Sequence, residues 1–172
     1  SIDERPAIVD SKCRCGDWEG DTVIGKGHRG ALVTLAERKS RYTVIGAVRN
    51  KTAKAVRNAV TKGLMPHKDR VHTITYDNGR EFTDHQGMAS DLETKIYFAH
   101  PYASWERGLN ENTNGLIRQY FPKQRDLTTV SSTEIEYTMD KLNHRPRKSL
   151  GYRTPHEVFF NTRTSLTVAL GS

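Results

Sequence analysis

Apolar and polar positions are distributed along this chain in a way that predicts interleaved strands and helices. Runs rich in β-branched residues predict strands over 17–25, 31–37, 41–48, 71–77 and 95–99. Apolar residues at helical spacing predict helices over 52–65, 83–93, 105–121, 132–144 and 154–161. Short turns join the first three strands, which is typical of an antiparallel meander. The order of elements predicts an α/β fold in which helices pack against one mixed sheet.

Two of the predicted helices carry clear start signals. Ser131 and Glu134 form the pattern of a capping box, in which the two side chains satisfy free N–H groups of the first turn. Thr154 precedes Pro155, a residue favoured at the first helical position, and is followed by Glu157. The sequence therefore predicts that the last two helices begin directly after residues 131 and 154.

The segment 105–121 is an amphipathic helix with an unusual polar side. At about 100° per residue, its apolar side gathers Trp105, Leu109, Leu116 and Tyr120, with Ile117 near the edge. A narrow stripe almost opposite consists of Arg107, Glu111, Asn114 and Arg118. One interpretation is a solvated face with an ion pair one turn long between Arg107 and Glu111. The amides within the stripe and the basic character of the chain favour a functional face.

Two aspartates are also placed where function is common. Asp21 ends the first apolar strand, and Asp77 ends the fourth. Open α/β sheets place their chemistry at the ends of strands. The alternative is that each aspartate only starts a turn, which is strongest for the run Asp77-Asn78-Gly79.

Together with Glu111, these aspartates supply three carboxylates from separate segments. Mg²⁺ prefers oxygen ligands and keeps several waters, so a few protein carboxylates suffice to hold it. Two such ions about 4 Å apart activate an attacking oxygen and stabilise a leaving oxygen on phosphate. The carboxylates repel one another, so we expect the site to need cations to organise it.

Charge supports a polyanionic partner. The chain has 172 residues, 27 Lys and Arg against 20 Asp and Glu, a net charge of +7 and a pI near 9.5. This balance favours a nucleic-acid partner, and the alternative is a basic soluble protein without one. The length is that of one ordinary domain.

Several other classes of protein are disfavoured. No apolar run approaches the roughly 18 residues of a membrane helix, and the polar start of the chain does not resemble a signal peptide. Cys13 and Cys15 have no second cysteine pair with which to complete a zinc site. We expect them to be free thiols in a reducing cytoplasm.

The run Gly25-Lys26-Gly27-His28-Arg29-Gly30 matches the dinucleotide-binding pattern G-x-G-x-x-G. That fingerprint must follow a strand and open a helix. Here the predicted strand 31–37 follows, so the run is interpreted as a hairpin turn.

Five segments resemble a known family in order along the chain. They read WEGDTVIG, TLAERKSRYT, TYDNGREF, FAHPYASWERGLNENTNGLIRQYFPK and LNHRPRKSLGYRTPHEVF, and they fall within residues 17–160. On these motifs the chain resembles the catalytic, integrase-core domain of bacterial DDE transposases of the insertion-sequence thirty (IS-thirty) family. The 33 residues between Asp77 and Glu111 are similar to the spacing in that family. The resemblance implies an RNase H-like, retroviral integrase-like fold with a five-stranded mixed sheet.

The resemblance also implies roles for individual residues. Asp21, Asp77 and Glu111 match the catalytic, metal-binding acids, with two Mg²⁺ or Mn²⁺ ions as cofactor. Glu106 lies outside the NEN motif and is rejected as the third acid. Glu19 shares a strand face with Asp21 and is interpreted as a neighbour of the site, not a ligand. Candidate DNA contacts are Asn78, Arg107, Asn114, Arg118 and Lys123, and the basic residues Arg145, Arg147 and Lys148 are further candidates.

The expected function is metal-dependent DNA cleavage by water, followed by attack of the new 3′-OH on target DNA. Partners would be DNA, as element ends and target, and further copies of the chain in a DNA complex, in a bacterial cytoplasm near the nucleoid. Two alternatives stay open: a catalytically silent DNA-binding or assembly domain, and a ribonuclease H-type nuclease.

The expected divisions are 1–16, an N-terminal extension; 17–161, the catalytic domain; and 162–172, a tail. Because no upstream helix-turn-helix region is present, we expect an excised catalytic domain.

Overall fold

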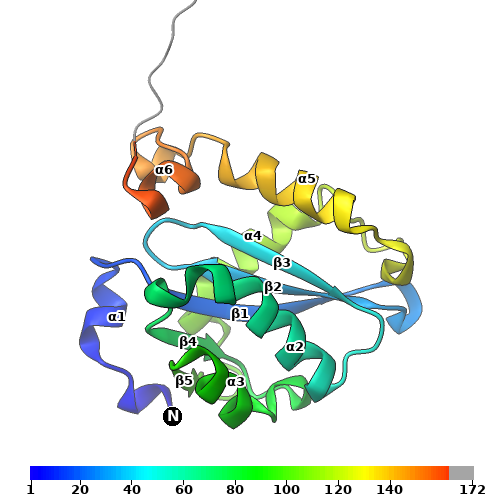
Figure 1. Cartoon of the computed structure of the whole chain (residues 1–172), viewed down its shortest axis with the longest axis horizontal. Helices are drawn as coiled ribbons and strands as arrows, with labels where there is room; N and C mark the ends of the chain where they lie inside the picture. The colour runs from blue at the N-terminus through cyan, green and yellow to red at the C-terminus, as the bar shows by residue number, and fades with distance from the viewer. Residues whose placement is uncertain (163–172) are drawn as a thin grey trace, which may run out of the picture.

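One mixed sheet forms the centre of the protein. The computed structural model describes residues 1–162. Its five strands are β1 (Asp17–Ile24), β2 (Ala31–Glu37), β3 (Thr43–Val48), β4 (Thr73–Tyr76) and β5 (Lys95–Phe98). They lie in the order β3-β2-β1-β4-β5. The first three are antiparallel, and β4 and β5 run parallel to β1. The predicted five-stranded mixed sheet is therefore confirmed (Figure 1).

Helices cover both faces of this sheet. They are α1 (Ala7–Ser11), α2 (Ala53–Leu64), α3 (His85–Leu92), α4 (Gly108–Ile117), α5 (Ser132–Asn143) and α6 (Pro155–Phe160). Short 3₁₀ turns are η1 (Ile2–Glu4), η2 (Lys26–His28), η3 (Met65–Arg70), η4 (Arg80–Phe82), η5 (Ser104–Arg107), η6 (Leu127–Thr129) and η7 (Lys148–Leu150). In Figure 1, α2 and α3 pass in front of the sheet and α4 lies behind it, while α5 runs beside the edge strand β3. Within residues 1–162, no helix is long and apolar enough to cross a membrane.

Alternation of side chains along the strands builds two cores. Val33, Leu35 and Val44 face the core that α2 and α3 cover, where Val60 and Met88 are fully buried. The neighbouring positions point the other way. The core under α4 and α5 contains Val23, Leu32, Ile45, Ile117, Phe121 and Leu142. The second core thus covers the sheet face that also carries Glu19 and Asp21.

The predicted start signals are confirmed. Ser131 and Thr154 each accept a hydrogen bond from the backbone N–H of the glutamate three residues on, and each glutamate carboxylate accepts one from the backbone N–H of the cap residue. The run 25–30 is a hairpin turn as predicted, because β1 and β2 pair up to Ile24 and Ala31 on either side of it. Gly27 in that turn has a φ of 58°, a conformation that glycine adopts without strain.

The prediction for 105–121 is wrong in two respects. The α-helix begins at Gly108, and residues 104–107 form the tighter η5 turn. The spacing of 100° per residue therefore does not apply to residues 105–107. Trp105 is consequently 77% exposed rather than part of the core. Ile117, placed near the edge of the apolar side, is instead fully buried. The buried side also includes Asn110 and Thr113, polar residues that a count of apolar positions does not include.

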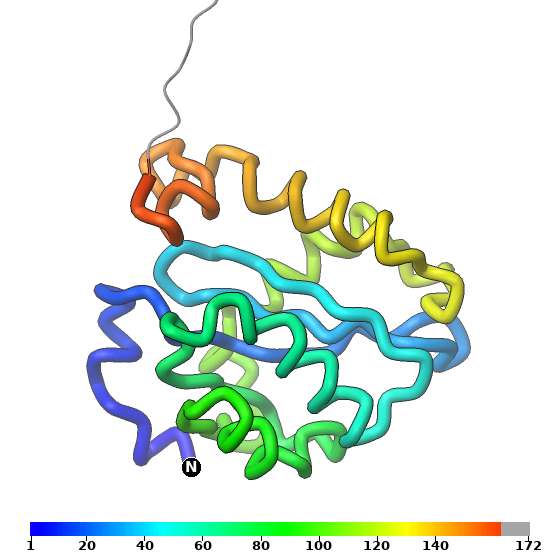
Figure 2. Tube along the Cα trace, in the orientation of Figure 1, coloured from blue at the N-terminus to red at the C-terminus, as the bar shows by residue number. Residues whose placement is uncertain are grey.

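Residues 1–16, for which the sequence indicated no element, contain η1 and α1. Val9 of α1 is fully buried, and its carbonyl accepts a hydrogen bond from Arg38 of the β2–β3 turn. The Arg5 guanidinium donates to the Thr75 hydroxyl of β4. The segment therefore begins beside β4 and β5, where the trace starts in Figure 2, and reaches the β2–β3 turn through α1. Of the expected tail 162–172, all but Thr162 lies outside the described residues.

Candidate active site

The parallel pairing of β1 and β4 brings the two aspartates together. Glu19 pairs with Thr75 in this register, so two further residues along each strand place Asp21 opposite Asp77. Asp77 directly follows β4, as predicted, whereas Asp21 lies within β1, which continues to Ile24. The prediction that Asp21 ends its strand is therefore wrong. The reason is that β1 pairs with β2 over its whole length, beyond the point where β4 stops.

A glycine allows this close approach. Gly20 precedes Asp21, and a Cβ atom added to it would lie 2.1 Å from the Tyr76 ring. Tyr76 itself is fully buried and precedes Asp77. Any larger side chain at residue 20 would therefore push β4 away from β1 and separate the two aspartates.

Asp21 is held by its neighbours on two sides. Its Oδ1 accepts the Thr22 N–H at 2.8 Å, and its Oδ2 accepts the side-chain N–H of Asn114 in α4 at 3.0 Å. Asn114 in turn accepts a hydrogen bond from the Thr34 hydroxyl at 2.9 Å. Burial raises the pKa of Asp21, while the Thr22 N–H and the Arg107 charge lower it and Asp77 raises it. The Asp21 carboxylate is thus held in one orientation, although burial disfavours its ionised form.

Arg107 lies between the two aspartates. Its Nη1 is 3.7 Å from Asp21 Oδ2, and its Nη2 donates to Asp77 Oδ2 at 3.3 Å. The other oxygen of Asp77 accepts the Gly79 N–H at 2.9 Å. Within the described residues, this guanidinium is the positive group that both carboxylates contact.

Glu111 is carried by α4, which begins directly after Arg107, but does not join the aspartate pair. It is exposed, one turn after Arg107 in α4, and makes no hydrogen bond or ion pair with residues 1–162. Among those residues, no three His, Cys, Asp or Glu side chains are close enough to share a metal ion. The structure thus brings two of the predicted acids together and leaves the third on the surface.

Glu19, interpreted from the sequence as a neighbour of the site, has a buried network of its own. Its side chain is 2% exposed and pairs with Arg38 at 2.5 Å. Its second oxygen accepts the backbone N–H of Asn110 in the first turn of α4, which has no side-chain N-cap. Glu19 therefore caps α4 from the neighbouring strand and fixes the helix that carries Glu111 to the strand that carries Asp21. Burial raises the pKa of Glu19, opposed chiefly by Arg38.

The predicted DNA contacts are mostly engaged inside the protein. The Asn78 amide donates to the Ala99 carbonyl at 2.8 Å, and Arg118 donates to the Ile24 carbonyl at 2.8 Å. Burial lowers the pKa of Arg118. Asn114 and Arg107 contact the aspartates as described. Lys123 is exposed and makes no hydrogen bond or ion pair with the described residues.

The segment between β5 and α4 carries two aromatic residues: Tyr102, for which the sequence predicts no role, and Trp105, which the helical pattern places on the apolar side. Tyr102 is fully exposed and Trp105 is 77% exposed. His100 holds this loop by contacting Glu106 at 2.8 Å and Asp3 at 3.0 Å, and the hydrogen bond to Glu106, followed by that to Asp3, raises the pKa of His100. A hollow of about 310 Å³ between Asp77 and the loop residues 99–104 opens beside Arg107. The signal available in the sequence was the pair of aromatic residues close before the NEN motif.

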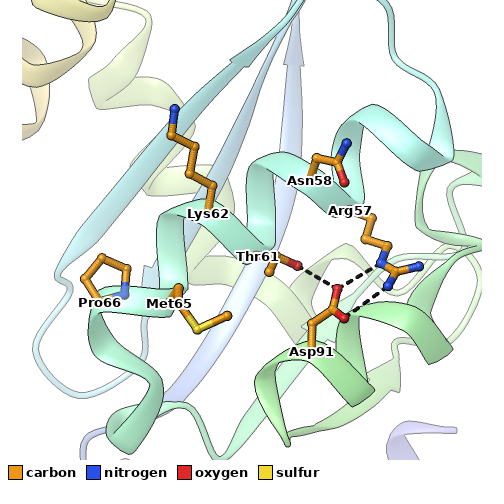
Figure 3. A pocket seen from close by; sticks show the side chains of 7 residues that line it. All are labelled: Arg57, Asn58, Thr61, Lys62, Met65, Pro66 and Asp91. Carbon is orange, nitrogen blue, oxygen red and sulfur yellow. Dashed lines mark hydrogen bonds and ion pairs between the residues drawn. The ribbon is translucent and has the colours of Figure 1, made fainter.

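A larger hollow of about 730 Å³ lies on the opposite side of the sheet. Figure 3 shows it between α2 and α3, lined by Arg57, Asn58, Thr61, Lys62, Met65, Pro66 and Asp91. Arg57 and Thr61 both donate to the Asp91 carboxylate there, which ties the two helices together. None of the predicted site residues lines this hollow.

Comparison with known proteins decides the family. The family model described as integrase core domain matches residues 12–104, a range that includes both aspartates of the pair. The chain belongs to the integrase core domain family. The match ends before Glu111, so the third acid lies beyond the matched range.

The relatives confirm the resemblance inferred from the motifs. The chain is 49% identical over 171 residues to the transposase for insertion sequence element IS4351 of Bacteroides fragilis, covering 99% of this chain and 52% of that protein. It is 41% identical over 158 residues to the transposase InsI for insertion sequence element IS30A of Escherichia coli (strain K12), covering 91% of this chain and 41% of that protein. The chain thus spans about half the length of the curated relatives it matches.

Solved integrases share the fold of this integrase core domain. A chain in the simian T-cell lymphotropic virus intasome, solved in complex with PP2A regulatory subunit B56 gamma, matches with a TM-score of 0.69 and 19% identity, over 88% of this chain and 55% of that one. The HTLV-2 integrase catalytic core domain, solved in complex with magnesium, matches with a TM-score of 0.65 and 18% identity, over 84% of this chain and 95% of that one. The predicted RNase H-like fold is confirmed.

Proposed function

We propose that this integrase core domain is the catalytic part of a DNA transposase in which Asp21, Asp77 and Glu111 hold two Mg²⁺ ions. The observation that carries the proposal is the β1–β4 register, which sets Asp21 opposite Asp77 at the edge where α4 begins. Strands with this pairing hold two carboxylates close together at the cost of their mutual repulsion. That cost is expected where the charges serve binding or catalysis.

The residues present fit divalent cations. Each aspartate has its Oδ1 engaged by a backbone N–H, and its Oδ2 faces Arg107, where the Asn114 amide also donates to Asp21 Oδ2. The two aspartates, joined by Glu111 when the ions bind, would supply the hard oxygen ligands that Mg²⁺ prefers. Asn110, beside Glu111, is 1% exposed, and neither polar atom of its side chain has a partner among the described residues. Its amide lies on the buried side of α4, away from exposed Glu111, and is a buried polar group without a partner in the described fold.

The proposed reaction has two steps. In the first, water attacks a phosphate at the element end, a P–O bond breaks, and a 3′-OH is released. In the second, that 3′-OH attacks a phosphate of target DNA, and the target 3′-oxygen leaves. The bound ions would activate the attacking oxygen and stabilise the leaving one. Asp21, Asp77 and Glu111 hold the ions, and Asn114 orients Asp21 through its hydrogen bond.

DNA is the proposed partner, as element ends and as target, and further copies of the chain assemble on it. The net charge of +7 supports binding to the phosphate backbone. Lys123 and Arg145 are exposed and suited to phosphate contact, while Tyr102 and Trp105 present aromatic faces on which a base can stack. Asn78, Arg107 and Arg118 remain proposed contacts whose side chains would have to leave their present partners, whereas Asn114 would stay on Asp21.

Cleavage of duplex DNA carrying element ends tests the proposal. We expect nicking and strand transfer to require Mg²⁺ or Mn²⁺ and to fall by about a hundredfold or more in Asp77→Asn and Glu111→Gln. Glu136→Gln, an exposed glutamate on α5, is the matched control and should cut at the wild-type rate. Circular dichroism establishes that each variant is folded.

The alternatives predict different results. A ribonuclease H-type enzyme would cut the RNA strand of an RNA–DNA hybrid in preference to duplex DNA. A silent DNA-binding domain would bind DNA and cut neither substrate. Wild-type cleavage by Glu111→Gln would exclude the assignment of the third acid.

A further inference from the structure

Arg107 supplies a positive charge next to both aspartates of the pair. Its side chain is only 13% exposed, and it reaches Asp21 at 3.7 Å and Asp77 at 3.3 Å. Two carboxylates on adjacent strands repel each other, and a positive charge between them offsets this repulsion. In the fold as described, that charge comes from Arg107.

Arg107 contacts the same oxygens that a shared metal ion would need. Asp21 Oδ1 and Asp77 Oδ1 accept backbone N–H groups from Thr22 and Gly79. The atoms facing Arg107 are Oδ2 of both residues. A cation bound to both carboxylates must therefore compete with the guanidinium for these oxygens.

The hold on Arg107 is weak enough to be released. Only its Nη2 makes a hydrogen bond to an aspartate; Nε and Nη1 are buried and have no hydrogen-bond partner among the described residues. The residue occupies the junction between η5 and α4, with φ −131° and ψ 40°, outside the regular helix. It also lines the hollow beside Asp77, which offers its side chain room to move.

We infer that Arg107 is a built-in counter-ion of the Asp21–Asp77 pair, and that divalent metal binds there only by displacing it. This inference rests on the metal-binding role proposed above for the two aspartates. Arg107 acts as a positioning residue: it keeps the carboxylates adjacent before metal arrives. Glu111, four residues later in the first turn of α4, then completes the site after the guanidinium has left.

Mn²⁺ binding to the DNA-free protein tests the inference without any catalytic assay. Free Mn²⁺ is followed by electron paramagnetic resonance during titration. Arg107→Gln should bind Mn²⁺ about tenfold more tightly than wild type, because the competing charge is gone. The same variant should melt at a lower temperature than wild type in chelator and regain the difference when Mn²⁺ is added. The control is Arg49→Gln, which removes one positive charge from an exposed arginine distant in sequence from Arg107. It should change neither the Mn²⁺ affinity nor the melting temperature.

A second variant separates this inference from the proposed function. Asp77→Asn should abolish the Mn²⁺ site. If it does and Arg107→Gln binds Mn²⁺ no more tightly than wild type, the counter-ion role is overturned and the metal site stands. If Asp77→Asn binds Mn²⁺ as wild type does, the metal site itself is overturned, and the role of Arg107 with it.

Trp105 provides a second readout because it lies two residues before Arg107 and is exposed. Mg²⁺ titration should change the tryptophan fluorescence of wild type, with Trp105→Phe removing the change, since Trp18 is fully buried. An unchanged spectrum at saturating Mg²⁺ would contradict movement of this junction.

Discussion

Glu19 and Asp21 lie two residues apart on the same face of β1, yet their surroundings differ. Glu19 is sealed beneath α4, paired with Arg38 at 2.5 Å and bonded to a backbone N–H of the helix. Asp21 has a side chain that is 25% exposed and a cationic partner 3.7 Å away. The first carboxylate has every interaction it needs inside the protein. The second is oriented by one amide and left open to a further partner.

The difference lies in the arginines. Arg38 is 7% exposed at its side chain and is also bonded to the Val9 carbonyl, so it cannot leave without unpacking α1. Arg107 is at a junction of the chain, beside a hollow, with two of its nitrogens unpaired. We therefore propose that β1 holds Glu19 for structure and Asp21 for binding, and that the freedom of the partner arginine to move separates the two roles.

Breaking the structural pair should have the largest effect on stability. Arg38→Ala leaves Glu19 buried and uncompensated, which should lower the free energy of unfolding by about 3–5 kcal/mol. Urea unfolding followed by circular dichroism measures it. Arg49→Ala serves as the control for loss of one arginine from the surface. A loss below about 1 kcal/mol would mean that the Glu19–Arg38 pair behaves as a surface ion pair.

Loosening the open carboxylate should affect chemistry more than folding. Asn114→Ala removes the 3.0 Å hydrogen bond that orients Asp21. DNA cleavage should fall about 10- to 100-fold, the usual effect of losing a residue that positions a metal ligand. The fall should appear in kcat, with the melting temperature little changed. Asn112→Ala, an exposed asparagine on the same helix, should cleave normally; equal losses in both variants would contradict a specific role for Asn114.

Neutralising Asp21 should stabilise the fold slightly. Burial raises its pKa above the ordinary value of 3.8, so the ionised form is disfavoured in the folded state. Stability is therefore lost as pH rises from that value through the raised pKa. Asp21→Asn should gain about 1 kcal/mol at pH 7, and the gain should shrink below pH 3.8. Thermal melts across pH measure it, with the exposed Asp69→Asn as control; a destabilised Asp21→Asn would contradict this reading of burial.

Much of the fold could be predicted because strand and cap signals are local. β-branched runs located all five strands, and Ser131 and Thr154 located two helix starts. The aspartate pair was partly predictable, since Asp77 does end its strand. The position of Asp21 opposite Asp77 depends on the β1–β4 register. That register is a long-range pairing, which local periodicity does not encode.

The environment of the third acid could not be predicted in the same way. The helix phase was set from Trp105, but η5 interrupts it, and buried polar residues such as Asn110 carry no apolar signal. Arg107 was expected to face DNA or solvent, and only the fold shows it directed at the two aspartates. Tertiary contacts, and not the local sequence pattern, determine where these side chains lie.

We propose that Asp21, Asp77 and Glu111 form a metal site that opens when Arg107 leaves. The most direct measurement is the anomalous scattering of Mn²⁺ in crystals of the protein bound to DNA. The account predicts a peak in contact with both aspartates, Glu111 turned toward it and Arg107 withdrawn. A peak that touches neither aspartate, or Arg107 still between them at saturating Mn²⁺, would contradict it.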